Sequence, residues 1–179
     1  MKKPLEFLFP WHVTHTELLA AGQSSLIINR PFNNRIPPKL YIFMVKQTAD
    51  WGSYVEDPFF YQTNGLQNYH LMLDSKVLID QDISIERGAV PDYLNGLQAQ
   101  NDGENFVPFS FFTKGSFVLA IKTNSSQDSE LSFEKKGNLS IHLKFAEVAG
   151  SNQIVYVVRV CHSSFEIDWD RNCITNYVY

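Results

Sequence analysis

The sequence predicts an all-β protein: an antiparallel β-sandwich with one or two short helices in its loops. Apolar and polar residues alternate along several segments, which is the period of a half-buried strand. Phe and Tyr, which favour strands, number fourteen and eight among the 179 residues. Turn signals rich in Gly, Pro and Asn separate these segments, as in sandwiches and barrels.

The clearest strands lie near the C-terminus. In 136–147, Leu139, Ile141, Leu143 and Phe145 fall on one face, and Ser140, His142 and Lys144 fall on the other. The segment 152–160 is apolar on both faces except at Arg159, which indicates a central strand covered on both sides. A short turn containing Gly joins the two segments and predicts a hairpin. A further strand, 164–172, is expected to close the chain.

Earlier strands are bounded by turn residues. Pro31–Asn34 reads as a turn between two strands, and Asp74-Ser75 reads as a two-residue hairpin turn, for which Asp-Gly would be a stronger signal. Thr113–Gly115 is another short turn. The expected strands are 24–29, 39–46, 69–73, 76–79, 106–112 and 116–122.

Two segments have helical character. The segment 92–100 follows Pro91 and is weakened by Gly96, and 48–55 is a looser candidate. The polar segment 124–136 is expected to be an exposed loop, and 1–13 an apolar arm before the first strand. We expect one domain over 1–179, because the length suffices for a substantial core and no linker divides it.

Composition narrows the classes of function. The formal net charge of −4 argues against a general nucleic-acid binder, since phosphate binding requires a positive surface. No apolar run approaches the ~18 residues of a membrane-spanning helix. The N-terminus begins like a signal peptide, but Glu6 and Pro10 interrupt its apolar stretch, so we expect a mature, intracellular sequence.

Cys161 and Cys173 are too few for a disulfide scaffold. They either pair across a terminal hairpin or remain as two free thiols. No P-loop and no Gly-x-Gly-x-x-Gly motif is present, and no cofactor is predicted.

Three polar groupings suggest chemistry, and each has a simpler structural interpretation. His12, His15 and Glu17 resemble half of a metal site, but residues three apart on a strand point to opposite faces, which favours surface histidines. Asp74, Asp80 and Asp82 suggest calcium, but their spacing fits no calcium loop, which favours solvated turn acids. Glu166, Asp168 and Asp170 share one strand face, as glycosidase carboxylates can, or as acids simply facing water do. The sequence therefore predicts no enzyme and no metal site.

Aromatic residues are the remaining candidates. The run Asp57–Gln62 contains Phe59, Phe60 and Tyr61, which either plug one end of the sandwich or contact a protein or sugar. Aromatic residues in the N-terminal arm also imply packing on another surface. The candidate interface residues are Phe7, Phe9, Trp11, Trp51, Phe59, Phe60, Tyr61, Trp169, Tyr177 and Tyr179.

Several stretches, read in order, resemble one family. They are 36–45, 52–61, 68–73, Lys136–Glu147, and Phe165–Asp168 with Arg171-Asn172. Together, over about residues 14 to 177, they are similar to the second jelly-roll domain of the double jelly-roll, hexon-type major capsid proteins of Polinton (Maverick) elements and adintovirus-like viruses. Three departures stand out. Complete members have two jelly rolls, 148–152 lacks the family's acidic-proline stretch, and 80–105 matches poorly.

The resemblance implies a jelly-roll topology and a structural capsid or capsid-derived protein that self-assembles. It also implies a homotrimer or a sister jelly-roll partner, no direct nucleic-acid binding, and a virion location if the chain is an intact viral protein. The alternative is a jelly-roll binding module that recognises a glycan or a protein, with Trp51, Phe59, Phe60 and Tyr61 as a sugar platform. An enzyme using His12 and His15 or the acidic strand is a third hypothesis.

Overall fold

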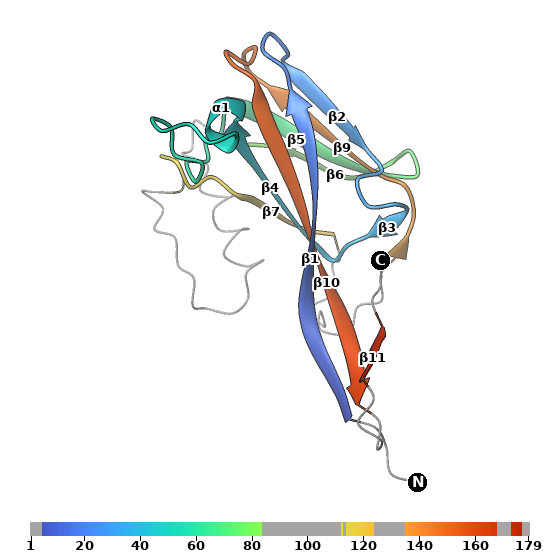
Figure 1. Cartoon of the computed structure of the whole chain (residues 1–179). Helices are drawn as coiled ribbons and strands as arrows, with labels where there is room; N and C mark the ends of the chain where they lie inside the picture. The colour runs from blue at the N-terminus through green and yellow to red at the C-terminus, as the bar shows by residue number, and fades with distance from the viewer. Residues whose placement is uncertain (1–4, 84–111, 113, 124–134, 168–172, 177–179) are drawn as a thin grey trace.

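A computed structural model describes residues 5–83, 112, 114–123, 135–167 and 173–176. Two antiparallel sheets face each other (Figure 1). Sheet A has the order β1 (Leu5–Leu19), β10 (Gln153–Ile167), β4 (Lys39–Lys46), β7 (Leu119–Lys122), and β11 (Cys173–Asn176) pairs with the end of β10. Sheet B has the order β2 (Ser25–Asn29), β9 (Leu139–Phe145), β5 (Leu66–Leu73), β6 (Lys76–Asp82). The predicted all-β sandwich is confirmed.

The strand pairs are nested along the chain, as in one long hairpin folded into two layers. The first strand pairs with the late strand β10, β2 with β9, β4 with β7, and β5 with β6. The small pair β3 (Arg35–Ile36) and β8 (Lys135–Lys136) fits the same nesting. Two further pairings, β10 with β4 and β5 with β9, join these ribbons into sheets. This nested order in two sheets is the jelly-roll topology.

The core lies between the two sheets and follows from strand alternation. Leu139, Ile141, Leu143 and Phe145 are at most 3% exposed, while the alternate residues of β9 face outward, as predicted. Val155 and Val157 of β10 are fully buried, consistent with its position between β1 and β4. Arg159 is buried as well, and its guanidinium lies 5.3 Å from the ring centroid of Phe32, a cation–π arrangement. The predicted strands at 24–29 and 39–46 match β2 and β4 closely.

Three predictions about strand pairing and strand boundaries are wrong. The segments 136–147 and 152–160 do not form a hairpin, because β9 belongs to sheet B and β10 to sheet A, so their connection crosses between the layers. No separate strand begins at 164, because β10 continues unbroken to Ile167. Neither is 5–13 an arm before the first strand: it is the first part of β1, paired with β10 throughout. Alternation identifies strands, but it does not identify their partners.

The predicted helices have different outcomes. The candidate at 48–55 is a single turn, α1 (Gln47–Asp50), which ends where Gly52 adopts a φ of 95° that only glycine tolerates easily. The candidate at 92–100 lies outside the described residues, as do 106–111. Most of the predicted loop 124–136 also lies outside them, but its last two residues form β8 rather than a loop.

One end of sheet A extends beyond the sandwich. Strand β4 pairs with β10 only as far as Val160. Beyond Val160, β10 pairs with β1 and, near its end, with β11. Figure 1 shows this ribbon projecting away from the two facing sheets. The projecting part carries Phe7, one of the predicted interface residues.

Candidate interaction surfaces

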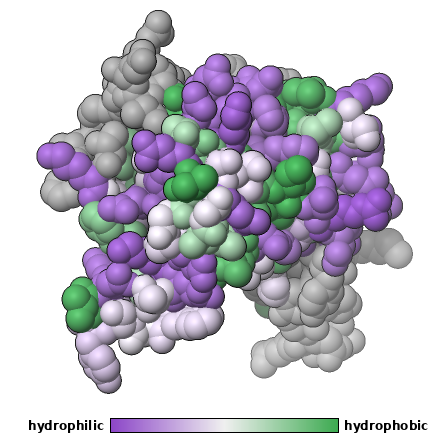
Figure 2. Space-filling view, turned by 90° about the horizontal axis from the view of Figure 1, so that it is seen from above, coloured by the Kyte–Doolittle hydropathy of each residue, from purple (hydrophilic) through white to green (hydrophobic). Residues whose placement is uncertain are grey.

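Exposed aromatic and apolar side chains gather in the segment after α1. Trp51 and Phe59 are each 74% exposed, and Tyr54 and Val55 are almost entirely exposed. Trp51 and Phe59 are among the interface residues predicted from the sequence, whereas Tyr54 and Val55 were not predicted. Figure 2, which looks down on the upper end of the molecule in Figure 1, shows several separate green apolar areas divided by purple polar groups. This end therefore offers individual apolar contacts rather than one continuous apolar patch.

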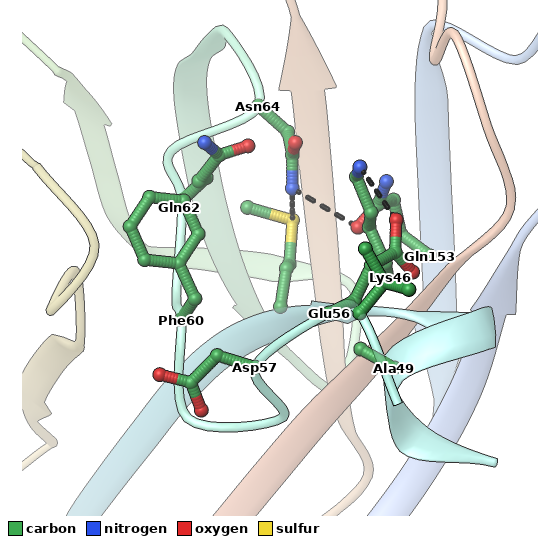
Figure 3. A pocket seen from close by; sticks show the side chains of 10 residues that line it. Lys46, Ala49, Glu56, Asp57, Phe60, Gln62, Asn64 and Gln153 are labelled. Atoms are coloured by element: carbon green, nitrogen blue, oxygen red, sulfur yellow. Dashed lines mark hydrogen bonds and ion pairs between the residues drawn. The ribbon is translucent and has the colours of Figure 1, made fainter. Parts of the chain in front are cut away.

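A pocket of about 230 Å³ opens at the same end of the sandwich. Met44 and Ala49, both buried, contribute to its lining. Phe60 and Gln62 face Lys46, Glu56 and Gln153 across it (Figure 3). Asn64, which also lines the pocket, donates a hydrogen bond of 3.4 Å from Nδ2 to Oε1 of Gln153. An aromatic wall beside amide and charged groups can bind an apolar ring that carries polar substituents.

Side chains from two elements hold the rim of this pocket in place. Lys46 Nζ lies 3.0 Å from Glu56 Oε1, and the Thr48 hydroxyl donates a hydrogen bond to the other carboxylate oxygen. These hydrogen bonds, from Thr48 first and Lys46 second, hold the pKa of Glu56 below its usual value. The segment containing Glu56 is thus tied to the end of β4 and to α1.

The opposite wall is anchored through the backbone. Tyr61 N–H donates to the Gly115 carbonyl at 2.7 Å, and Phe117 N–H donates to the Tyr61 carbonyl at 3.1 Å. The ring of Phe60 lies directly over Gly115. Tyr61 turns toward the outer face of sheet A, where its ring centroid is 4.7 Å from that of Phe43. The predicted aromatic run is therefore divided between an exposed residue, a pocket wall and a sheet contact.

Of the other predicted interface residues, Phe7 is 43% exposed on the projecting ribbon and Trp11 is half-buried. The backbone of Phe9 lies in β1, opposite Ser163. Trp169, Tyr177 and Tyr179 lie outside the described residues. Their assignment to an interface remains a prediction.

The polar groupings singled out in the sequence contact neighbouring protein groups. His15 Nε2 lies 3.4 Å from Glu17 Oε2, while His12 is on the other face of β1, as the spacing predicted. Asp74 binds the backbone N–H and the side-chain amide of Asn138, at 2.9 and 3.0 Å. In the parts of the chain that the structure describes, no three His, Cys, Asp or Glu side chains are placed to hold a metal ion.

The outer face of sheet B carries the remaining predicted acids. Asp80 lies 2.9 Å from Nδ1 of His70, and Asn68 donates a hydrogen bond of 2.7 Å to Asp82. Contact with His70, followed by the Asn68 amide, lowers the pKa of Asp80. Of the predicted acidic strand, Glu166 is half-buried at the end of β10, and Asp168 and Asp170 lie outside the described residues.

The two cysteines lie on strands that do not align them. Cys161 is opposite Trp11, whereas Cys173 is opposite Ile167, six residues further along β10. At ~3.3 Å per residue this offset is roughly 20 Å, far beyond the ~7 Å limit between the Cα atoms of a disulfide. The possibility of free thiols is therefore favoured over pairing within the chain. Among the described residues, no helix has the length and apolar character needed to cross a membrane.

Solved structures with a similar fold include virus capsids. The Sputnik virophage structure matches 98% of this chain with a TM-score of 0.57 and 13% identity. The mavirus major capsid protein matches 98% with a TM-score of 0.52 and 12% identity, and the PBCV-1 virus capsid 99% with 0.54 and 10%. This chain has the jelly-roll fold of virus capsid proteins. No family model and no curated protein matches the sequence.

These neighbours are double jelly-roll major capsid proteins, so the jelly-roll topology implied by the resemblance is confirmed. The chain spans 39% of the Sputnik chain, 42% of the mavirus chain and 52% of the PBCV-1 chain. It therefore corresponds to about half of each matched protein, or slightly less. The specific relationship to Polinton elements and adintovirus-like viruses remains a prediction from the sequence.

Proposed function

We propose that this chain is a structural capsid or capsid-derived protein that assembles through contacts between jelly rolls. The observation that carries the proposal is the match of at least 98% of the chain to capsid structures in one continuous jelly-roll topology. A shell requires repeated, individually weak interfaces rather than a reactive pocket. The exposed aromatic residues and the projecting ribbon supply surfaces for such contacts.

The proposed assembly is a homotrimer, or a pairing with a sister jelly roll. Because the matched chains are about twice as long, each has room for a second unit of this size. The proposed location is a virion capsid if the chain is an intact viral protein, and the interior of the cell otherwise. Direct nucleic-acid binding forms no part of the proposal, in keeping with the net charge of −4. Enzymatic activity forms no part of it either.

Sedimentation velocity and negative-stain imaging over a range of concentrations test this proposal. Concentration-dependent oligomers, trimers first, or closed particles are the expected result. A chain that stays monomeric at the highest soluble concentration, alone and with a sister jelly-roll domain, would count decisively against assembly. In the source genome, neighbouring genes for a packaging ATPase or a protease would support the proposed Polinton relationship.

A binding module is the second candidate function, and the pocket beside Phe60 favours it. Its aromatic wall, its amide pair and the Lys46–Glu56 ion pair suit a sugar ring. A glycan array identifies a ligand, and Phe60→Ala should then weaken binding at least tenfold. Phe59→Ala is the matched control, because its neighbouring ring is more exposed and does not line the pocket. An array without hits, or equal binding by both variants, would remove this candidate.

A further inference from the structure

The outer face of sheet B brings two histidine side chains together on neighbouring strands (Figure 1). His70 of β5 and His142 of β9 are direct cross-strand partners, and their ring centroids lie 5.8 Å apart with the planes inclined by 65°. The residues that follow His70 and precede His142, Leu71 and Ile141, are fully buried, so the two imidazoles point away from the core. Both histidines are only partly buried, and an ion from solution can reach them.

The spacing of the two rings suits a single metal ion. At ~2.0–2.1 Å per Zn–N bond, and with each nitrogen ~1.1 Å from its ring centre, two imidazoles on one tetrahedral Zn²⁺ have centres ~5 Å apart. The observed 5.8 Å is within about 1 Å of that value. Rotation of the two side chains on an open sheet face can supply this difference.

Asp80 on β6 determines which nitrogen of His70 is available. Its Oδ1 lies 2.9 Å from Nδ1 of His70. An ionised carboxylate only accepts hydrogen bonds, so Nδ1 carries the hydrogen, and Nε2 of the neutral ring keeps its lone pair for a metal ion. Asp80 is held in turn by the side-chain amide of Asn68, which donates a hydrogen bond of 3.2 Å to the same oxygen. Carboxylates orient the histidine ligands of metal ions in this way.

The surroundings of the pair also favour a cation. Nε2 of His142 lies 3.4 Å from the hydroxyl of Ser140, which can donate or accept, so one nitrogen of His142 keeps a lone pair in either tautomer. Asp80 lies in the same row of the face as the two histidines. The next row contains Lys144 and Asp82, whose charges offset each other. The local charge is therefore negative.

We propose that His70 and His142 bind one divalent late transition-metal ion of the Zn²⁺ class, with Asp80 as the positioning residue for His70. Imidazole nitrogens suit Zn²⁺, Cu²⁺ and Ni²⁺, whereas Mg²⁺ and Ca²⁺ prefer oxygen ligands. Within the described residues, no third His, Cys, Asp or Glu side chain completes the pair. Water therefore fills the remaining positions of the ion. The site does not depend on the proposed assembly, and each can fail without the other.

Calorimetric titration of the protein with Zn²⁺, and separately with Mg²⁺, tests the proposal. All proteins carry Cys161→Ser and Cys173→Ser, because thiolates also bind Zn²⁺. We expect one Zn²⁺ per chain and no binding of Mg²⁺. His142→Asn should weaken Zn²⁺ binding at least tenfold. His15→Asn is the matched control and should bind as the parent does, because His15 also lies 3.4 Å from a carboxylate, that of Glu17, but is opposite Val157 rather than a second imidazole.

A second pair of variants separates positioning from charge. Asp80→Ala removes the carboxylate that faces Nδ1 of His70, whereas Asp82→Ala removes the same charge from the adjacent row. We expect roughly tenfold weaker Zn²⁺ binding for Asp80→Ala, as for other carboxylates that orient a histidine ligand, and a much smaller change for Asp82→Ala. Equal losses in the two variants would reject the positioning role of Asp80.

Thermal unfolding provides a readout that is independent of the calorimetry. An ion that binds only the folded pair stabilises it, so Zn²⁺ should raise the Tm of the parent protein and not that of His142→Asn. If His142→Asn is less stable than the parent without metal, His70→Asn provides the same comparison at a side chain that is 35% exposed. The proposal is overturned if the parent binds no Zn²⁺, or if His142→Asn or His70→Asn binds it as well as His15→Asn does.

Discussion

The hydroxyl group of Tyr156 on β10 donates a hydrogen bond to the carboxylate of Asp50 in α1, which lies 106 residues earlier in the chain. The same tyrosine ring stacks on Phe43 of β4, with centroids 5.0 Å apart and planes 8° apart. Tyr61 also packs against Phe43, with ring centroids 4.7 Å apart. Three rings and one carboxylate thus connect α1, the central strands of sheet A and the segment that forms the pocket wall.

Removing this hydroxyl group should destabilise the fold modestly. Tyr156→Phe retains the stacked ring and loses the hydrogen bond, so we expect the free energy of unfolding to fall by about 1 kcal/mol at pH 8. Urea denaturation measures the change. Tyr54→Phe is the control, because Tyr54 is fully exposed, and its stability should equal that of the wild type. A drop of the same size in both variants would mean that the Asp50 contact contributes nothing specific.

The same pair predicts a dependence on alkaline pH. The hydrogen bond to Asp50, followed by burial, raises the pKa of Tyr156 to about 12, whereas an unfolded tyrosine titrates near ~10. The folded state therefore holds this proton more tightly than the unfolded state. The resulting stability is complete below about pH 10 and is lost as pH rises through about 12. The difference between the wild type and Tyr156→Phe should narrow from pH 8 to pH 11, and parallel pH profiles would contradict this.

Gly115 is a position where a single methyl group should disrupt the pocket wall. Its φ is 133°, and a Cβ placed there would lie 2.3 Å from a ring carbon of Phe60. We expect Gly115→Ala to cost about 1–3 kcal/mol through backbone strain and steric overlap. Gly150→Ala is the matched control, because no atom lies within 4 Å of that Cβ position, and it should be nearly neutral.

A double variant separates the two contributions to this loss of stability, which are backbone strain at Gly115 and steric overlap with Phe60. In Gly115→Ala combined with Phe60→Ala the ring is absent, so only the backbone strain should remain. The loss caused by Gly115→Ala, measured by thermal or urea unfolding, should therefore be smaller in the Phe60→Ala background. An equal loss in both backgrounds would show that the Phe60 ring simply moves aside.

The hairpin turn at Asp74-Ser75 offers a stabilising change. Both residues have positive φ values, 46° and 68°, as in the turn type that favours Asp-Gly or Asn-Gly. Ser75→Gly should raise the free energy of unfolding by roughly 1 kcal/mol, because glycine adopts this conformation without strain. Ser140→Gly in the middle of β9 is the control and should destabilise instead. A loss of stability for Ser75→Gly would indicate that the serine side chain supports the turn.

Sequence patterns predicted individual elements better than their partners. The alternation of Leu139, Ile141, Leu143 and Phe145 and the two-residue turn after Leu73 are both present in the structure. The partners of β9 and β10 were not predictable from alternation, because a strand pattern specifies which face is buried and not which strand lies beside it. The jelly-roll topology came instead from the family resemblance.

The candidate surfaces were predicted in part for a similar reason. Runs of aromatic residues drew attention to Phe59, Phe60 and Tyr61, but the sequence could not distinguish their three different environments. The row formed by Tyr61, Phe43 and Tyr156 combines residues from three distant segments, so no local motif could reveal it. Only the strand registers show that Phe43 and Tyr156 are direct neighbours on sheet A.

Those registers also make a chemical prediction about the two cysteines. Because Cys173 lies opposite Ile167 and not opposite Cys161, no disulfide can form between them in this fold. If the protein is denatured without reductant and then alkylated, both thiols should therefore be modified. A second sample that is reduced before alkylation should have the same intact mass. A product two hydrogens lighter that resists alkylation would show that the end of β10 and β11 pair in a different register. A covalent dimer on a non-reducing gel would instead indicate pairing between chains.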